Sequence, residues 1–281
     1  MGEATIGLLH PGEMGAAVGQ CLVAAGHRVL WLPAGRSEAT AARARAAGLT
    51  GAGDLADLVR QADVVLSVCP PLAALDIARQ VAGSGFGGLY LDANAIAPAT
   101  AREVAGIVGG GIVGGGIVEG GGATFVDGGI IGTPPVEPGF IRLFLSGAKA
   151  QEIGALFDGT DVATRLVERG AAGAGRPAGE VGAASAVKVA YASWTKGSAA
   201  LLLAARALAR AEGVEDALLA EWEQSQAGLI QRWDRAATSA TAKGWRWVAE
   251  MEEIAATMAA DGLPAGFHQA AAQIYRDPPT G

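Results

Sequence analysis

The sequence predicts an α/β fold in which a doubly wound parallel sheet is followed by an all-helical domain. In the first half of the chain, short β-like apolar runs alternate with alanine-rich helical runs. After residue 182 almost every segment has a helical pattern rich in alanine and leucine. The chain has 281 residues, which is enough for two domains of ordinary size without disulfides or metals to hold them together.

The N-terminal elements follow one another as strand, helix, strand. A single helix between successive strands is typical of parallel pairs in a doubly wound sheet. The expected strands are Ala4–Leu9, Arg28–Leu32, Val64–Val68, Leu89–Asp92, Thr124–Asp127, Ile141–Ser146 and Ala163–Val167. The expected helices are Gly12–Ala25, Ala39–Ala47, Ala73–Ala82 and Gln151–Phe157.

The C-terminal part is expected to contain helices alone. A stretch rich in glycine and proline separates the two parts, and we place the domain boundary there, giving domains 1–172 and 173–281. The long helix Ala183–Ala211 joins them. Glycines predict breaks at Gly244 and at 262–264, so the remaining helices are expected at Ala217–Ala237, Trp245–Asp261 and Gly266–Tyr275.

Glycine is abundant, with 43 residues, and ten of them lie in 106–122. There the sequence repeats imperfectly as GIVGG, GIVGG and GIVEG. A period of five fits neither a helix nor a strand, and glycine weakens both. We interpret the repeat as an expanded surface loop, and the alternative is a flexible lid over a site.

Composition limits the classes of function. The chain carries 21 Lys+Arg and 28 Asp+Glu, a net charge of −7, with no basic block, so nucleic acid is not an expected partner. Cys21 and Cys69 lie far apart and no metal-ligand spacing is present, so no metal is expected. No apolar run is long enough to span a bilayer and the first residues lack a signal peptide, which predicts a cytoplasmic protein without a membrane partner.

The turn after the first expected strand has the pattern of a dinucleotide site. Gly12 and Gly15 supply the last two glycines of a GxGxxG motif, while His10 stands in place of the first. Backbone N–H groups at such a turn and helix N-terminus bind a pyrophosphate, although a merely structural turn is the alternative. The expected cofactor-binding residues here are His10, Pro11, Gly12, Glu13 and Met14.

The end of the second expected strand favours NADP over NAD. No carboxylate is present to bind a ribose 2′-hydroxyl, and Arg36 stands there with Ser37 and Thr40. A guanidinium beside two hydroxyls suits a 2′-phosphate, and the alternative is a solvated loop arginine.

A later loop is also expected to border the nicotinamide, because ligands of open α/β sheets bind at the carboxyl ends of strands. It contributes Val68, Cys69 and Pro70. Since no histidine neighbours Cys69 in the sequence, we expect a buried thiol rather than a nucleophile.

These motifs together resemble the β-hydroxyacid dehydrogenases, relatives of 3-hydroxyisobutyrate dehydrogenase and of the NAD-binding domain of 6-phosphogluconate dehydrogenase. The resemblance rests on GLLHPGEMG, SVCPP, LDANAIAP, FVDGGIIG and GEVGAASAVK, in the family's order, at 7–15, 67–71, 91–98, 125–132 and 179–188. It covers essentially the whole chain and implies a Rossmann-type domain followed by a helical one. The run 245–254 resembles a poorly characterised subgroup with its own helical C-terminal domain.

The resemblance implies that Lys188 is the general acid/base. A lysine facing a cationic nicotinamide in a dry cleft has a lowered pKa, which helps it to exchange a proton with a substrate hydroxyl. The flanking residues Val187 and Val189 are apolar, which favours a cleft over the alternative of a surface lysine.

The substrate side departs from the family pattern. Ile131 replaces a serine that grips a carboxylate, and Ala192 replaces a substrate-binding asparagine. We therefore expect a bulkier or less anionic substrate than a simple small 3-hydroxy acid. The candidate substrate-binding residues are Asn94, Gly129, Ile131, Gly132, Thr133, Tyr191 and Thr195, of which Asn94 also borders the cofactor or, alternatively, only forms an Asx turn.

The expected function is NADP-dependent hydride transfer between nicotinamide and a hydroxy or carbonyl substrate. Two alternatives stay open: an imine reductase that reduces C=N bonds, and an NADP-binding sensor without chemistry. The resemblance also implies a homodimer formed through the helical domain.

Overall fold

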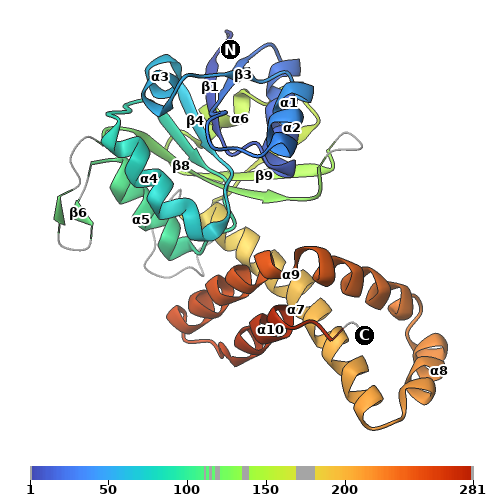
Figure 1. Ribbon diagram of the computed structural model, residues 1–281. Helices are drawn as coiled ribbons and strands as arrows, with labels where there is room; N and C mark the ends of the chain where they lie inside the picture. Colours follow the sequence, from blue (N-terminus) through green and yellow to red (C-terminus); the bar gives the residue numbers. More distant parts are fainter. Residues whose placement is uncertain are drawn as a thin grey trace. The chain divides into compact units, whose positions relative to one another are not determined.

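The computed structural model describes residues 2–110, 112–113, 116–117, 121–134, 139–168 and 181–279. The chain forms two compact units, residues 1–188 and 189–281 (Figure 1). The boundary expected at 172/173 lies outside the described residues. Among the described helices, none combines the length and the apolar character needed to cross a membrane.

The first unit is built on an eight-stranded sheet in the order β10-β9-β8-β5-β4-β1-β2-β3. All neighbouring strands are parallel except β8 and β9, which pair antiparallel. Within this sheet, the strands β3-β2-β1-β4-β5-β8 have the order of a doubly wound sheet, with the switch point between β1 and β4. This order confirms the expected fold class. The strands are β1 Thr5–Leu9, β2 Arg28–Trp31, β3 Thr50–Gly51, β4 Val64–Ser67, β5 Leu89–Asp92, β8 Thr124–Ile131, β9 Ile141–Ser146 and β10 Val162–Leu166.

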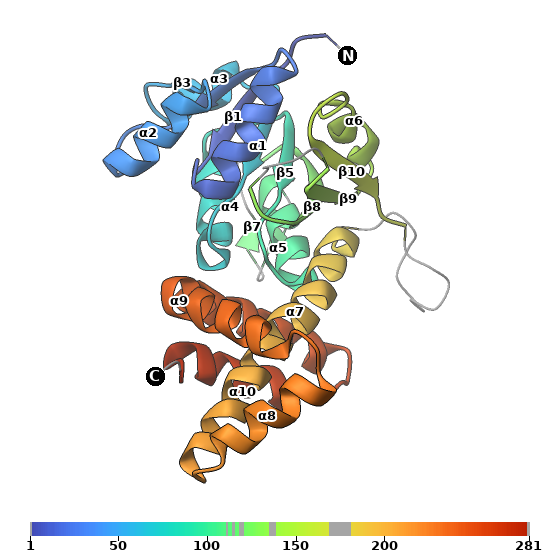
Figure 2. The same ribbon diagram turned by 90° about the vertical axis from the view of Figure 1, so that its right-hand side faces the viewer.

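Helices cover both faces of this sheet (Figures 1 and 2). Successive residues of a strand point to opposite faces, so Leu8 joins a core with α1, α2 and α6, whereas Leu9 joins a core with α3, α4 and α5. The helices are α1 Glu13–Ala24, α2 Glu38–Ala46, α3 Leu55–Gln61, α4 Ala74–Gly83, α5 Pro98–Val108 and α6 Ala150–Ala155, with a 3₁₀ turn η1 at Pro71–Ala73.

The glycine repeat is only partly a loop. Helix α5 continues to Val108, so the first residues of the repeat are helical, contrary to the expectation of a loop from residue 106. The short strands β6 (Ile112–Val113) and β7 (Gly116–Ile117) pair antiparallel. The remaining residues of 111–120 lie outside those described.

Some elements were not predicted from the sequence. These are β3, β6, β7, α3 and α5, together with the second half of β8. Strand β8 continues to Ile131 through Gly128 and Gly129, because the chain there pairs with β9 and approaches other backbone too closely for side chains. The expectation that strand structure ends at Asp127 was therefore wrong.

The second unit is helical, as expected. Helix α7 (Ala183–Ala211) begins in the first unit, continues into the second and has the predicted bounds. Three more helices follow, α8 Glu215–Ser225, α9 Leu229–Ala260 and α10 Gly266–Arg276. Their core includes Leu203, Met251, Ile254 and Tyr275, each at most 2% exposed.

The predicted break at Gly244 was wrong. Helix α9 passes through it without interruption, and the break lies earlier, at Gly228, where φ is 79°. At Gly244 an added Cβ would lie 3.2 Å from the carbonyl oxygen of Tyr275 in α10. The glycine therefore lets α9 and α10 pack closely rather than ending a helix.

Candidate functional site

The turn between β1 and α1 has an unusual backbone. His10 has φ of 69°, and it is the one described residue other than glycine in the left-handed region. Its carbonyl oxygen accepts a hydrogen bond from Gly12 N at 2.8 Å. The same oxygen would lie 2.5 Å from a Cβ added at Gly15, so a side chain there would collide with the turn.

Helix α1 starts immediately after this turn. Gly12 occupies the N-cap position and no side chain caps the helix. A Cβ added at Gly12 would meet nothing within 4 Å, so space is open in front of the first turn. Pro11 is buried, whereas Glu13 is exposed and Met14 is half-buried. An uncapped helix N-terminus with open space before it suits an anionic ligand.

A second polar group lies at the start of α2. Ser37 is the N-cap, and its Oγ accepts a hydrogen bond from Thr40 N at 3.3 Å and lies 3.1 Å from Thr40 Oγ1. Arg43 Nη2 donates to Thr40 Oγ1 at 3.1 Å. Arg43 was not singled out from the sequence, although its spacing of three from Thr40 on a helix could have indicated it.

Three polar atoms near these two turns are buried with no hydrogen-bond partner among the described residues: His10 Nδ1, Arg36 Nε and Arg43 Nε. Burial, and then the positive charge of Arg36, lowers the pKa of His10 to about 4. The imidazole is therefore neutral at pH 7 and senses the nearby guanidinium. Buried guanidinium donors without acceptors are costly, and phosphate oxygens would satisfy Arg36 Nε and Arg43 Nε. The residues present thus fit a phosphorylated dinucleotide.

Asn94 ties together the loops that follow β4 and β5. Its Oδ1 accepts a hydrogen bond from Cys69 N at 2.5 Å, and its Nδ2 donates to Ser67 Oγ at 3.1 Å and to Asp92 Oδ2 at 2.9 Å. Its backbone N donates to Asp92 Oδ1 at 2.9 Å, so the side chain that forms an Asx turn here is that of Asp92 and not that of Asn94. Asn94 is 2% exposed, so its side chain organises the loop from inside.

The other residues of this loop lie close to the first turn. A Cβ added at Gly15 would lie 3.6 Å from Val68 Cβ, so the β4 loop and the start of α1 are neighbours. Pro70 is exposed and is the N-cap of η1. Burial raises the pKa of the Cys69 thiol to about 12, so it is protonated at neutral pH and is not an activated nucleophile.

A row of buried polar residues crosses four neighbouring strands. Ser67, Asp92, Asp127 and Ser146 are directly opposite one another on β4, β5, β8 and β9. Each is at most 2% exposed. Burial is the main cause that raises the pKa of Asp92 to about 7, and the charge of Asp127 adds to it. The sequence did not indicate this row, because strand register cannot be deduced from the strands one at a time.

The structure brings Lys188 and Gly129 together. A Cβ added at Gly129 would lie 3.2 Å from Lys188 Cβ and 2.7 Å from the carbonyl oxygen of Ala184. Helix α7 therefore lies directly on β8, and glycine is required at the contact. Lys188 is half-buried.

The remaining candidate residues are distributed as follows. Ile131 ends β8 and is 3% exposed, while Thr133 is exposed. Gly132 has φ of 129°, and a Cβ there would lie 2.2 Å from the carbonyl oxygen of Phe140. Tyr191 and Thr195 lie on the part of α7 that belongs to the second unit, with Thr195 Oγ1 donating to Tyr191 O at 3.1 Å.

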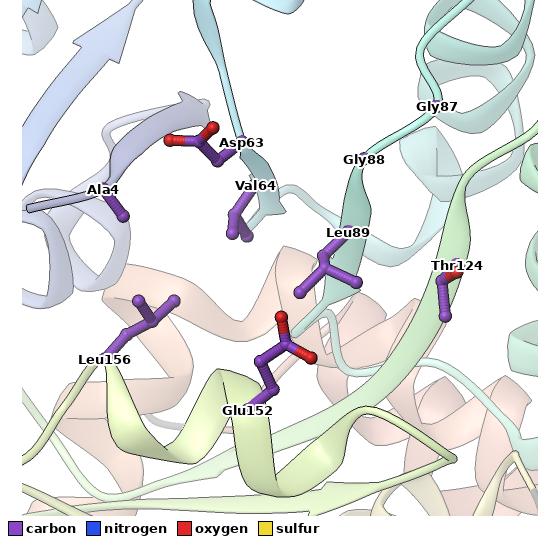
Figure 3. A pocket seen from close by; sticks show the side chains of 9 residues that line it. All are labelled: Ala4, Asp63, Val64, Gly87, Gly88, Leu89, Thr124, Glu152 and Leu156. Atoms are coloured by element: carbon purple, nitrogen blue, oxygen red, sulfur yellow. The ribbon is translucent and has the colours of Figure 1, made fainter. Parts of the chain in front are cut away.

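A cavity of about 200 Å³ lies at the other end of the parallel strands (Figure 3). It is lined by the first residues of β4, β5 and β8 and by the carboxylates of Asp63 and Glu152. It contains none of the candidate residues. Within the described ranges, no group of three or more His, Cys, Asp or Glu side chains is arranged to hold a metal ion.

Comparisons with known proteins agree with this architecture. Residues 209–277 match a family described as a domain of unknown function, DUF1932. An uncharacterized 28.5 kDa protein in the 7S RNA 5′ region of Methanothermus fervidus is 28% identical over 192 residues. That match covers 68% of this chain and 66% of the relative, just under two thirds of its length.

Solved structures match over nearly the whole chain. A conserved protein of unknown function, reported as structurally similar to 3-hydroxyacid dehydrogenases, is 28% identical with a TM-score of 0.65, and 97% of each chain is covered. The 3-hydroxyisobutyrate dehydrogenase of Mycobacterium tuberculosis is 19% identical with a TM-score of 0.68, over 98% of this chain and 93% of that one.

Reductases of C=N bonds share the same architecture. The imine reductase of Myxococcus stipitatus, solved with NADP⁺, is 18% identical with a TM-score of 0.56, over 97% of this chain and 93% of that one. At this identity the likeness concerns the fold. The chain thus has the two-part architecture of the 3-hydroxyacid dehydrogenases, with DUF1932 at its C-terminal end, which confirms the resemblance expected from its motifs.

Proposed function

We propose that this chain is an NADP-dependent oxidoreductase that interconverts a hydroxy and a carbonyl compound, with Lys188 as general acid/base. The observation that carries the proposal is the contact between Lys188 and Gly129, on a sheet whose switch-point turn fits a dinucleotide. When bound, the nicotinamide cofactor supplies or accepts the hydride. Lys188 gives a proton to the substrate oxygen in reduction and takes it back in oxidation.

The residues proposed to hold the cofactor come from three neighbouring βα junctions. The turn of His10, Pro11, Gly12, Glu13 and Met14 would bind the pyrophosphate. Val68, Cys69, Pro70 and Asn94 form the loop that would border the nicotinamide, with Asn94 fixing that loop by its hydrogen bond from Cys69 N.

The preference for NADP is proposed from the group at the start of α2. Arg36, Ser37 and Thr40 are joined there by Arg43, and both guanidinium groups have a buried Nε with no partner among the described residues. A 2′-phosphate would accept hydrogen bonds from these donors, whereas the 2′-hydroxyl of NAD would leave the cations without an anion.

The substrate is proposed to be bulkier or less anionic than a small 3-hydroxy acid. Gly129, Ile131, Gly132 and Thr133 are its proposed contacts in the first unit. Ile131 offers no hydroxyl, so a carboxylate would depend on backbone N–H groups at Gly132 and Thr133.

A second candidate is the reduction of imines. Ile131 and Ala192 stand at the positions of the serine and asparagine that the resemblance to the β-hydroxyacid dehydrogenases leads us to expect. The chain therefore lacks two side chains expected to bind a hydroxy acid. Lys188 favours the hydroxy/carbonyl pair, because a lysine can carry the proton that such a substrate exchanges.

Replacement of Lys188 by methionine tests the proposal. We expect Lys188→Met to lower kcat by about 10²–10⁴, the usual contribution of acid–base catalysis, while NADPH binding measured by fluorescence stays unchanged. Lys149→Met is the matched control, because Lys149 is an exposed lysine paired with Glu152. Near-normal turnover in Lys188→Met would refute the assignment.

The substrate panel separates the candidates. Aldehydes, ketones, hydroxy acids and cyclic imines are assayed side by side with NADPH or NADP⁺. Turnover of imines alone would favour the imine reductase. Tight NADPH binding without oxidation across the whole panel would favour a sensor and contradict both enzymes.

A further inference from the structure

Asp127 lies on β8 in the middle of the buried polar row, two residues before Gly129. It is 1% exposed, yet it accepts hydrogen bonds from three residues, which are Ser146 on β9 and Gly182 and Ser185 at the start of α7. Such a buried carboxylate is stable only when its acceptors are used.

Most of them hold the first turn of α7. Asp127 Oδ2 accepts from Gly182 N at 3.0 Å and from Ser185 N at 3.1 Å, and Oδ1 accepts from Ser185 Oγ at 2.5 Å. The residue before α7 is Gly182, with φ of 97°, which has no side chain to cap the helix. A residue more than fifty positions earlier therefore does what a local Ser, Thr or Asp usually does.

Ser146 of β9 completes the attachment. Its Oγ donates to Asp127 Oδ2 at 2.8 Å and accepts from Ala184 N at 3.1 Å. The first-turn N–H groups of α7 thus point at acceptors on two adjacent strands. The side chain of Asp127 also lies at the N-terminal end of the helix, where an acceptor stabilises the first turn.

The same strand contacts α7 a second time, one turn further on. A Cβ added at Gly129 would lie 2.7 Å from Ala184 O and 3.2 Å from Lys188 Cβ. Lys188 follows Ser185 by three residues, so the two lie on neighbouring positions of one helix face. With one contact at Ser185 and another at Lys188, β8 restrains both the position of α7 along its axis and its rotation.

We propose that Asp127 is a positioning residue which, with Ser146 and Ser185, holds α7 on β8 and thereby sets where the Lys188 ammonium lies. The inference rests on the proposed role of Lys188. Asp127 takes no part in proton transfer itself. A misplacement of the acid/base by about 1 Å is enough to reduce turnover strongly, which gives a distant hydrogen bond a large effect on catalysis.

The first experiment measures turnover in a double-mutant cycle. We expect Asp127→Asn to lower kcat by about tenfold or more, with the KM for NADPH unchanged, because a misplaced Lys188 affects chemistry and not cofactor binding. In the Lys188→Met background the same change is expected to have no further effect. Asp158→Asn is the control, since Asp158 is an exposed aspartate of the same unit, and it is expected to leave kcat unchanged.

Two milder variants keep the inference testable if Asp127→Asn does not fold. Ser185→Ala and Ser146→Ala each remove one hydroxyl of the network and are expected to lower kcat less than Asp127→Asn. An equal loss for Asp127→Asn with and without Lys188, or a parallel rise in the KM for NADPH, would overturn the inference.

The second experiment needs no turnover. Competitive acetylation of lysines, followed by mass spectrometry, reports the reactivity of Lys188 relative to the exposed Lys149. We expect this ratio to change several-fold in Asp127→Asn and Ser185→Ala and to stay constant in Asp158→Asn. A constant ratio in every variant would refute the positioning role. If the wild-type chain turned over no member of the substrate panel, the proposed function would fail, and this ratio would still decide the inference.

Discussion

At the residue scale, the most informative position is His10. It stands where a dinucleotide-binding turn usually has glycine, and it adopts the left-handed conformation that glycine would adopt freely. Such backbone strain in a non-glycine residue costs of order 1–3 kcal/mol and is common at functional sites. The Nδ1 atom of His10 is buried at this turn and has no hydrogen-bond partner among the described residues. This supports the proposed role of the side chain in binding the cofactor.

Arg36 is the residue on which the cofactor preference depends. We expect Arg36→Ala to raise the Kd for NADPH by about tenfold or more, since a charge-assisted hydrogen bond is lost, and to leave the Kd for NADH almost unchanged. Calorimetry or fluorescence titration with both cofactors measures this. Arg45→Ala is the matched control on α2, where Arg45 pairs with Glu38 at the surface. Equal losses for both cofactors would contradict the phosphate role.

At the element scale, the ends of the strands decide the chemistry. The carboxyl ends of β1, β4 and β5 bring three loops of distant sequence to one edge of the sheet. Strand β8 continues beyond that level and meets α7. The row from Ser67 to Ser146 therefore connects the loop expected at the cofactor with the helix that carries Lys188.

This row predicts a dependence of stability on pH. The pKa of Asp92 is raised from 3.8 to about 7, so the folded chain keeps a proton that the unfolded chain releases between these values. This contribution to stability is complete below about pH 4 and is lost as the pH rises through 7, by at most about 1.4 kcal/mol per pH unit. We expect Asp92→Asn to remove this slope from the free energy of unfolding between pH 4 and 7, measured by urea denaturation. The exposed Asp158→Asn should keep the wild-type slope, and an unchanged slope in Asp92→Asn would disprove the titration.

At the scale of the whole molecule, α7 carries an apolar stripe within the second unit. Tyr191, Trp194, Leu201 and Leu208 are 45%, 68%, 55% and 64% exposed. Trp194, Leu201 and Leu208 are seven residues apart and so share one heptad position, and Tyr191 lies three residues before Trp194, so the four side chains follow one face of the helix. Large exposed apolar patches of this kind mark interaction sites.

We propose that a second copy of the chain covers this stripe, in line with the homodimer expected from the resemblance. Light scattering at micromolar concentration is expected to give twice the 28.0 kDa mass of one chain. Replacing Leu201 and Leu208 together by glutamate is expected to yield monomers, because charges buried in an apolar seam are unfavourable. The matched double change of the exposed Glu221 and Glu223 to glutamine should leave the dimer intact. A wild-type monomer would contradict the proposal.

Much of this architecture could be predicted from the sequence. Short apolar runs alternating with helical runs rich in alanine determined the order of strands and helices, and the alanine and leucine pattern determined both ends of α7. The short strand β3 and the seven-residue helix α3 escaped prediction, because elements of that length carry too little periodic signal. Gly244 was misread because glycine weakens a helix by itself, whereas here it allows a close contact between two helices.

The sequence by itself determined the fold class, the turn after β1 and the candidates Lys188 and Arg36, since each depends on residues close together in the chain. Only the tertiary structure decided that the Asn94 side chain is hydrogen-bonded within the protein, and that Asp127 caps a helix starting 56 positions later at Ala183. These facts depend on strand register and on helix packing against the sheet. Register and packing are set by contacts between segments far apart in the chain, and no local pattern of residues encodes them.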